Sequence, residues 1–499
     1  MLETALAQLR FAASILFGLP LSVGALDRLV DAAIETRHEF GAIGPAAAEF
    51  LGGPPLDEET RRDMQLRRFR TQAVAAARET VFYAGLFEKV GLDPQRLRFE
   101  DIAAIPVTPK EAMRNTPDAF VRRSTLPAFR TMTTGTTGKP TSTYFSAHEM
   151  QTTALLSAIS FLQEGHIGPD DIVQISTSSR ATLGNTCFSQ ACQRVGAVWY
   201  LAGLVQPAQG LALLAEEHHI PGKKPRTSFL NTYPSYLGEL VECGLAAGYR
   251  PADFGLERIS VGGEVVTAGL KARCQQLFGA VIFVEGFGMT EVWPLGATRC
   301  AAGHLHWEPS HGLVEVLSLD ASGPAQPGEV GTLVATPFAP YREAGVVLRY
   351  NTEDVVESLA GPFTCGLRDW PATSDIRGKL RLSVRHDRGW TYPRDVLEAL
   401  EAAEEDVPLP ARCGFWSASG GVAVEAVVRA ATPAARRRIE TALEGQGVPL
   451  RELHLVEDRR QLQQPLPLRC DLREDSFVTS QPPTAPEIRA AGRPAEERL

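Results

Sequence analysis

The chain has 499 residues, which at roughly 150 residues per domain is enough for two to four domains. Hydrophobic residues make up 44% and charged residues 22%, which fits a folded globular protein and is too apolar for a disordered one. With 59 acidic and 50 basic side chains the net charge is −9, which argues against a nucleic-acid binder and against a binder of anionic membranes. Only seven of the basic residues are lysines, so the position of each lysine is informative.

Cysteine usage and an apolar stretch near the N-terminus bear on the compartment. Eight cysteines, none arranged as Cys-x-x-Cys, predict free thiols in a reducing compartment, and we expect a cytoplasmic protein. The apolar stretch 11–26 follows Glu3 and Arg10, is too short to span a bilayer and precedes no small-residue cleavage site. We interpret it as a buried helix rather than a signal peptide, and we expect no membrane span elsewhere.

The first 300 residues predict an α/β protein. Helical patterns broken by Pro20 and Pro54 fill residues 1–60, and residues 57–92 predict one long amphipathic helix. Strands and helices then alternate, which is typical of a parallel sheet covered by helices. The predicted strands are 171–175, 226–230, 259–261 and 281–284, and the predicted helices are 209–218, 235–246 and 267–278.

The pattern changes after residue 300. Val and Leu alternate between Gly and Pro turns over 312–357, which predicts antiparallel strands. Gly378 opens a region of mixed helices and strands, and the Ser-, Pro- and Glu-rich end predicts a disordered tail. We therefore expect a large multi-sheet N-terminal domain and a small α+β C-terminal domain. The expected boundaries are a helical extension at 1–60, the large domain at 61–376, the small domain at 377–475 and the tail at 476–499.

A glycine-rich segment, Thr131–Pro140, combines five hydroxyl side chains, two glycines and a lysine. Glycine lets the backbone approach an anion closely, hydroxyls and amides donate hydrogen bonds, and lysine adds positive charge. The spacing differs from the Walker loop, which would need glycine at 133 and a hydroxyl residue at 140. We predict phosphate binding, with a surface turn as the alternative. The candidate residues are Thr133, Thr134, Gly135, Thr136, Thr137, Gly138 and Lys139.

Three further motifs follow in order along the chain. Val261–Glu264 follows one predicted strand, and Phe287–Glu291 follows the next, at the carboxyl edge of the sheet where open α/β folds bind ligands. The third motif, Arg349–Asp354, lies in the antiparallel region. Each alone is explained by a tight turn, a corner or a solvated charged edge, but together with the first loop they form a pattern.

This pattern resembles the adenylate-forming superfamily of acyl-CoA synthetases, adenylation domains and luciferases. Within it, the chain is most similar to the phenylacetate–CoA ligase branch over residues 60–400. The segments that carry this narrower resemblance are Val81–Phe87 with Gly91–Pro94, Ile105–Lys110, and Thr232–Tyr236.

The resemblance implies a role for each motif. The loop at 133–140 would hold the ATP phosphates, and Asp354 would accept hydrogen bonds from both ribose hydroxyls. Thr290 would contact the α-phosphate, and Glu291 would hold Mg²⁺. The adenine pocket would be lined by Gly262, Gly263, Glu264, Phe287, Gly288 and Met289, with Phe287 standing where the family has a tyrosine.

The implied reaction is attack of a substrate carboxylate on the α-phosphorus of ATP, which forms an acyl-adenylate and releases pyrophosphate. Metal and cationic groups are needed because negative charge accumulates on the phosphates. The catalytic residues implied are Glu291, Thr290, Lys139 and Lys379. A thiol, of CoA or of a carrier-protein phosphopantetheine, would then take the acyl group.

The sequence departs from the family at its C-terminal end. The family's hinge reads roughly Gly-Arg-x-Asp-Asp, whereas this chain has Gly378-Lys379 and neither aspartate. The family's catalytic lysine near the C-terminus is also absent, since no lysine follows Lys379. Arg469 or Arg473 would have to take its place, and arginine differs from lysine in geometry.

Three functional hypotheses follow from these departures. The first is an acid ligase that uses CoA or a carrier thiol. The second is an adenylate-forming ligase whose acceptor is an amine or another nitrogen nucleophile in natural-product biosynthesis. The third is a catalytically reduced nucleotide-binding protein with a partner role.

A metal site is a separate hypothesis. Some members of the branch carry a structural zinc, and here Phe363 replaces one of its cysteines. Structural zinc takes four tetrahedral ligands, for which Cys300, His306, Cys365 and His304 remain. The alternative is that both histidines are half-exposed strand residues.

The acyl pocket of the family would be aromatic-rich in this chain. Its candidate lining residues are Phe188, Trp199, Tyr200, Tyr233, Tyr236 and Trp293. Such a lining favours a planar aromatic or aryl-acetic acid, although each residue is as readily explained as part of a core. The resemblance also makes a homodimer an expectation.

Overall fold

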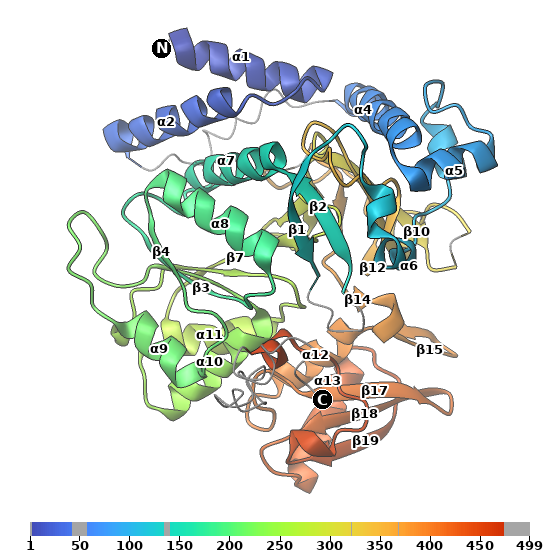
Figure 1. The fold of residues 1–499 in the computed structure, drawn as a ribbon. Coiled ribbons are helices and arrows are strands. Elements are labelled where there is room, and N and C mark those ends of the chain that lie inside the picture. The colour runs from blue at the N-terminus through green and yellow to red at the C-terminus, as the bar shows by residue number, and fades with distance from the viewer. Residues whose placement is uncertain (1, 42–56, 134–139, 321, 368, 474–499) are drawn as a thin grey trace, which may run out of the picture.

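The computed structural model describes residues 2–41, 57–133, 140–320, 322–367 and 369–473. Figure 1 shows a large α/β body with helices α1 and α2 at one end and a smaller domain at the other. The large body contains an eight-stranded and a four-stranded sheet, and the smaller domain is built on a three-stranded sheet covered by helices. The predicted fold class is therefore confirmed. The predicted tail lies outside the described residues.

The N-terminal segment forms a pair of helices, α1 (Leu2–Phe17) and α2 (Val23–Phe40). The apolar stretch 11–26, which we expected to form one helix, is divided between them. The chain turns at Gly18, whose φ of 67° favours glycine, and Ser22 caps α2 by accepting a hydrogen bond from the Ala25 amide at 3.3 Å. Helix α2 packs against α7 (Ala147–Gln163) of the large body.

The single helix expected over 57–92 is wrong, because two helices occupy this stretch. These are α4 (Glu58–Glu79) and α5 (Val81–Val90). Thr80 ends the first and caps the second, with its side chain accepting a hydrogen bond from the Tyr83 amide at 3.2 Å. The periodicity of apolar residues continues across this break, so it gave no signal of the cap.

The eight-stranded sheet carries two of the sequence motifs. Its order is β13-β9-β8-β7-β6-β5-β3-β4, and β7 to β4 run parallel. Their bounds are β3 (Ile172–Ser176), β4 (Val198–Leu201), β5 (Phe229–Thr232), β6 (Arg258–Val261) and β7 (Ile282–Gly288). The antiparallel strands are β8 (Gly296–Arg299), β9 (Leu305–Trp307) and β13 (Ala372–Thr373). Strand order reverses between β3 and β5, which is where such sheets form a ligand-binding crevice.

Two expected strands differ at their ends from those observed. The strand expected at 226–230 begins at Phe229, and the one expected at 281–284 continues through Gly288. The helices at 209–218, 235–246 and 267–278 are present as α9 (Pro207–Ala215), α10 (Pro234–Ala246) and α11 (Ala268–Phe278). These three share a core with one face of the sheet, and α2, α7 and α8 (Thr182–Val195) share a core with the other.

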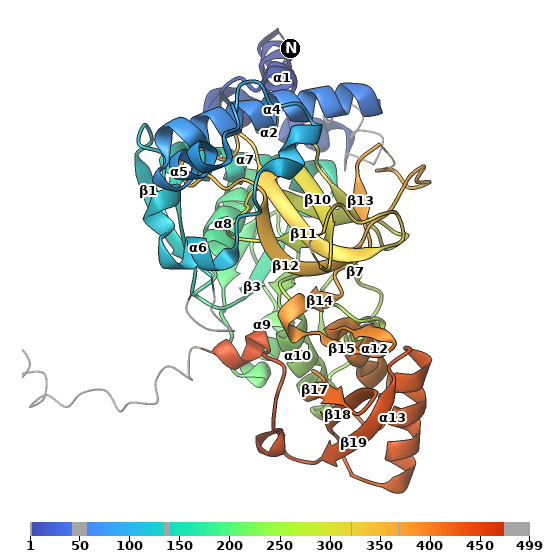
Figure 2. The ribbon, with the colours of Figure 1, turned by 90° about the vertical axis from the view of Figure 1, so that its right-hand side faces the viewer.

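The antiparallel region forms the four-stranded sheet β10-β11-β12-β14, which confirms the prediction for 312–357. Its strands are β10 (Gly312–Ser318), β11 (Val330–Pro337), β12 (Tyr350–Glu357) and β14 (Gly378–Lys379). Figure 2 shows β10, β11 and β12 side by side above the small domain. A hairpin, β1 (Pro127–Met132) and β2 (Ser142–Ser146), and the short helix α6 (Lys110–Asn115) complete the large body.

The small domain has its own core between one sheet and two helices. Its elements are β15 (Val384–His386), β16 (Gly389–Thr391), α12 (Pro393–Ala402), β17 (Cys413–Ala418), β18 (Gly421–Val427), α13 (Pro433–Gly445) and β19 (Leu450–Val456). A last helical turn, Arg469–Leu472, packs back against α10 of the large body. Among the described residues, no helix combines the length and the apolar character that a bilayer crossing requires.

Candidate active site

The base of the glycine-rich loop is closed by two threonines. The Thr133 amide donates to the Thr141 carbonyl at 2.9 Å, and the Thr141 amide donates to the Thr133 hydroxyl oxygen at 3.0 Å. The segment thus joins two antiparallel strands, unlike the Walker loop, which leads from a strand into a helix. The other residues expected to bind phosphate, Thr134, Gly135, Thr136, Thr137, Gly138 and Lys139, lie outside the described residues.

Glu291 is the most unusual charged residue of the motifs, because its carboxylate is fully buried. Oε1 accepts a hydrogen bond from the Tyr350 hydroxyl at 3.1 Å and lies 3.3 Å from Nζ of Lys110. Within the described part of the chain, Oε2 has no hydrogen-bond partner. A buried charged oxygen without a partner is costly, so this atom fits a group that binds there. Carboxylate oxygen is the ligand type that Mg²⁺ prefers.

Tyr350 and Lys110 hold one side of this carboxylate. Burial and the Glu291 charge raise the pKa of Tyr350 well above its ordinary value, so the phenol stays protonated and can donate. Lys110 lies at the start of α6. The sequence identified it only as part of the 105–110 segment, although its rarity as one of seven lysines was a usable signal. Thr290, the residue before Glu291, is half-buried at the same turn.

Asp354 and Lys379 face each other across strands β12 and β14. Nζ of Lys379 lies 2.7 Å from Oδ2 of Asp354 and 2.9 Å from the Thr352 carbonyl. Burial lowers the pKa of the Lys379 amine, while Asp354 opposes that shift by favouring the charged form. Lys110 and Glu291 also act on this amine, so the structure brings four charged residues of the site together.

The glycine motif after β6 turns sharply beside Tyr233. Gly263 has a φ of 82°, and a Cβ there would lie 3.5 Å from the Tyr233 ring. A Cβ on Gly262 would meet nothing within 4 Å, so open space lies beside this backbone. The structure therefore leaves room next to the two glycines at the carboxyl edge of the sheet.

The Glu264 side chain is held by hydrogen bonds from the backbone. Its half-buried carboxylate accepts hydrogen bonds from two backbone amides, of Ser235 at 2.8 Å and of Arg469. Burial raises the pKa of this carboxyl, although the hydrogen bonds act in the opposite direction. Its side chain thus clamps the start of α10 to the C-terminal segment.

The residues at the end of β7 border the glycine motif on the other side. The Phe287 ring packs on Trp307, with 5.3 Å between ring centroids and an angle of 60°. Met289 packs against the same core, and a Cβ on Gly288 would lie 3.2 Å from the Trp293 ring. A larger residue at 288 would therefore press on Trp293.

In the C-terminal segment, the two arginines that could replace the missing catalytic lysine make different contacts. Arg473 contacts Glu239 of α10 and lies 3.3 Å from Oε1 of Gln206. Arg469 instead lies close enough to Glu264 and Tyr233 to influence the pKa of both. The Cys470 amide donates to Ser235 Oγ at 3.1 Å, and its side chain is buried in the large-domain core. The segment is thus anchored beside the glycine motif.

The four residues of the metal hypothesis come together. The ligand atoms of Cys300, His304 and His306 lie within 4.8 Å of one another. The Cys365 sulfur lies 3.1 Å from Nε2 of His306. Nδ1 of His304 is buried and has no hydrogen-bond partner in the described ranges. Two thiols and two imidazoles fit a tetrahedral zinc ion, and Phe363 packs against both histidine rings.

The six aromatic residues expected in the acyl pocket are not brought together. Trp199 is 37% exposed on the edge strand β4, and Phe188 packs against Phe229 in the core beneath α8. The hydroxyls of Tyr200 and Tyr236 bind Gln174 at 2.7 Å and the Val205 carbonyl at 2.8 Å. The other two, Tyr233 and Trp293, border the glycines of the motifs.

The expected acyl pocket and the observed positions of its six aromatic residues differ for a physical reason. Distance along the sequence from a motif does not fix which face of a strand or helix a side chain occupies. Trp293 lies against a small apolar cluster, and its indole N–H is buried with no partner among the described residues. The buried members of that cluster are Phe145, Met150, Leu183 and Cys187.

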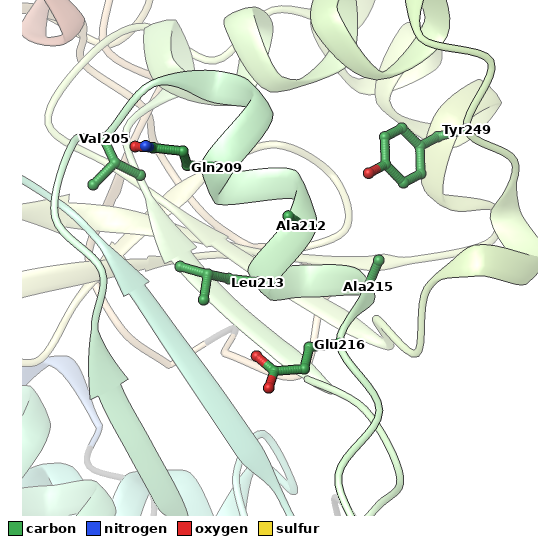
Figure 3. A pocket seen from close by; sticks show the side chains of 7 residues that line it. All are labelled: Val205, Gln209, Ala212, Leu213, Ala215, Glu216 and Tyr249. Atoms are coloured by element: carbon green, nitrogen blue, oxygen red, sulfur yellow. The ribbon is translucent and has the colours of Figure 1, made fainter.

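A pocket of about 630 Å³ lies elsewhere, along the outer side of α9 (Figure 3). It shares no residue with the motifs. Its lining residues are Val205, Gln209, Ala212, Leu213, Ala215, Glu216 and Tyr249. Apolar side chains dominate it, with the Glu216 carboxylate and the Tyr249 hydroxyl at its border.

Comparisons with known proteins find relatives of the chain in sequence and in fold. No protein-family model matches the chain. The chain is 27% identical to a phenylacetate-coenzyme A ligase of Thermus thermophilus over 368 residues, which are 71% of this chain and 78% of the relative. It is 26% identical to the Pseudomonas putida phenylacetate-coenzyme A ligase over 307 residues, 60% of this chain and 67% of that one.

Solved structures show the same fold. A 2-hydroxyisobutyryl-CoA ligase in the postadenylation state superposes with a TM-score of 0.67 at 20% identity, over 82% of this chain and 88% of that one. An open conformation of that ligase gives a TM-score of 0.60 over 81% and 89%.

The chain therefore has the two-domain fold of this CoA ligase. In sequence it is similar to phenylacetate-coenzyme A ligases, over at least 67% of the length of each of the two relatives. These similarities support an ATP-dependent, AMP-forming acid ligase.

Proposed function

We propose that the chain activates an aromatic or aryl-acetic acid as its acyl-adenylate and transfers the acyl group to the thiol of CoA or of a carrier protein. The observation that supports this proposal most is that Oε2 of the buried Glu291 has no hydrogen-bond partner among the described residues. Glu291 lies in a cluster of charged residues with Lys110, Asp354 and Lys379. The names of the relatives support CoA as the acceptor.

The chain's residues divide the work of adenylation. Glu291 would hold Mg²⁺ through Oε2, and when bound that ion would neutralise phosphate charge. Tyr350 and Lys110 orient the carboxylate by occupying Oε1. Asp354 would bind the ribose hydroxyls, with Lys379 fixing its carboxylate. Thr290 and the 133–140 loop would donate to the phosphates.

Arg469 is our candidate for the cation that the missing lysine would supply. It lies beside Glu264 and Tyr233 at the glycine motif, whereas Arg473 is engaged with α10. Arginine keeps the charge and adds a fixed fork of donors.

The aromatic acid is supported by Tyr233, Trp293 and the apolar cluster next to Trp293. A nitrogen nucleophile is the alternative acceptor, and it is favoured by the docking of the small domain. Thr267 and Glu401 bind each other between α11 and α12, and Arg273 donates to the Val407 carbonyl at 2.9 Å. Such contacts oppose a rearrangement between two half-reactions.

We also propose that zinc fills the Cys300, His304, His306 and Cys365 site as a structural ion. The site adjoins Trp307, on which Phe287 packs, so the ion would stabilise the positions of these two rings. All eight cysteines are free, which supports a cytoplasmic setting. Freshly purified protein should contain about one zinc per chain, and Cys365→Ser should lose it. A stoichiometry near zero would reject this part.

The test of the main proposal is ATP–pyrophosphate exchange with a panel of phenylacetate, benzoate, 2-hydroxyisobutyrate and straight-chain acids. We expect exchange with the aromatic acids, then thioester formation when CoA is added. Exchange with no acid would leave only the catalytically reduced hypothesis. Exchange without thioester, but with amide product from added amines, would establish the nitrogen acceptor instead.

A further inference from the structure

Helix α6, which packs against β12 (Figure 1), carries two cations on one face. Lys110 and Arg114 are four residues apart and therefore lie one turn above each other. Nζ of Lys110 is 3.3 Å from Oε1 of Glu291, the oxygen to which Tyr350 donates. Burial and Glu291 raise the pKa of Tyr350, and Arg114 is close enough to oppose that rise. Both cations thus lie beside the buried carboxylate and its tyrosine partner.

Arg114 has no counter-charge in the protein. No ion pair or hydrogen bond in the described part of the chain involves its side chain, and its Nε is buried. Glu353, the other acid that acts on Tyr350, is already paired with Arg381. A guanidinium nitrogen that is withdrawn from water without a partner is costly. Arg114 is therefore placed to bind an anion, and its planar fork of N–H groups matches the oxygens of a phosphate.

Strand β12 shows where along the site this cation lies. Tyr350 begins the strand and forms a bridge with Thr108, two residues before α6. Asp354 lies four residues further along β12 and pairs with Lys379 of β14 at 2.7 Å. The two positions are up to about 13 Å apart along the strand. Since Asp354 would bind the ribose, Arg114 lies toward the far end of the phosphate chain.

The charges of the cluster also favour an anion at that end. Lys379 is paired with Asp354, and Lys110 with Glu291. Arg114 is thus a third cation beside two carboxylates that already have basic partners. Any metal held by Glu291 would add further positive charge, and the phosphates of ATP would balance this excess.

We infer that Arg114 binds the β- and γ-phosphates of ATP and the pyrophosphate that they form on leaving, an inference that rests on the proposed adenylation. In that step the acid's carboxylate oxygen bonds to the α-phosphorus. The bond from this phosphorus to the bridging oxygen breaks, and the oxygen keeps the electron pair as part of pyrophosphate, with no proton transferred. Arg114 neutralises the charge that accumulates on this leaving group.

The first test compares ATP with AMP, because AMP lacks both of these phosphates and neither nucleotide needs the acid in order to bind. Titration calorimetry of the full chain with Mg²⁺ measures both affinities. Arg114→Met keeps the apolar stem and should weaken ATP binding about 10- to 100-fold, with AMP affinity changed less than about threefold. Arg114→Lys should recover part of the loss, since it restores the charge without the fork. Arg96→Ala is the matched control, because the Arg96 side chain is 88% exposed and the variant should bind both nucleotides as wild type does.

Pyrophosphate exchange gives a second readout with the acid that the wild type activates. The KM for pyrophosphate should rise about 10-fold or more in Arg114→Met, whereas the KM for the acid should stay the same. A residue that only supports the fold of the site would change both constants.

Four results would overturn the inference. Equal losses of ATP and AMP affinity in Arg114→Met would make Arg114 a structural residue, and unchanged ATP affinity would remove it from phosphate binding. A loss of CoA affinity with intact ATP affinity would assign the phosphates of CoA to this cation instead. These three results leave the proposed function standing. A wild-type chain that binds neither ATP nor AMP would overturn the proposed function together with the inference.

Discussion

Glu291 and Glu264 end two neighbouring motifs of the same sheet, yet their carboxylates are used in different ways. Glu291 is fully buried, and its Oε2 has no partner among the described residues. Glu264 is half-buried, and backbone amides of Ser235 and Arg469 occupy its oxygens. A buried charge left open indicates a binding function, whereas a carboxylate saturated by backbone amides indicates a clamp.

The largest effect is expected from Glu291→Gln. The change keeps the size of the side chain but removes the charge that would hold the metal, so pyrophosphate exchange should fall by about 100- to 1,000-fold. The free energy of unfolding should change less than activity does, because the loss of the Lys110 ion pair is offset in part by removal of a buried carboxylate whose Oε2 has no partner among the described residues, and the amide oxygen can still accept from Tyr350. Exchange and chemical denaturation measure the two effects.

Glu111→Gln is the matched control for this variant. Glu111 is exposed on α6, so its replacement should change neither quantity. If Glu291→Gln kept its exchange activity while losing stability, Glu291 would be a structural residue like Glu264.

The next largest effect on pyrophosphate exchange is expected from replacing Arg469, with Arg473 as the comparison. Arg469→Ala should lower exchange about 10- to 100-fold, since it removes a cation beside the glycine motif. Arg469→Lys should recover part of that loss, because it restores the charge. Arg473→Ala should lower exchange less than threefold or so, and mainly loosen the contact with Glu239. Equal losses in both alanine variants would contradict a specific role for Arg469.

The positions of Glu291 and Glu264 could be predicted from the sequence. The β-α alternation predicted the parallel sheet, and the residue types of the motifs predicted their positions at its carboxyl edge. The partners were not accessible: Tyr350 and Lys110 reach Glu291 across 59 and 181 positions of the chain, and Arg469 reaches Glu264 across 205. No local pattern encodes such contacts. The six aromatic residues that we expected in one acyl pocket lie apart for a similar reason. Packing decides which face of a helix or strand each side chain occupies, and the local sequence does not reveal it.

Glu264→Gln should act on docking rather than chemistry. Glutamine retains one acceptor oxygen, so one of the two amides loses its partner, at a cost of about 1–3 kcal/mol. The segment 468–473 should then detach more often, which limited proteolysis near the C-terminus would measure. Ser235→Ala is a comparison, as it removes only the acceptor of the Cys470 amide and should cost about 1 kcal/mol. Unchanged proteolysis in Glu264→Gln would refute the clamp.

The smallest expected effect is a pH dependence that belongs to Glu264. Burial raises the pKa of this carboxyl in the folded chain, so between the unfolded and the folded pKa the folded state binds more protons. Its contribution to stability is complete below the unfolded value and is lost as pH rises through the folded one. The slope is at most about 1.4 kcal/mol per pH unit. The free energy of unfolding of wild type minus that of Glu264→Gln should therefore decrease as pH rises from 4.5 to 7. A difference that instead increased with pH would show that the two amide hydrogen bonds, rather than burial, dominate at this carboxylate.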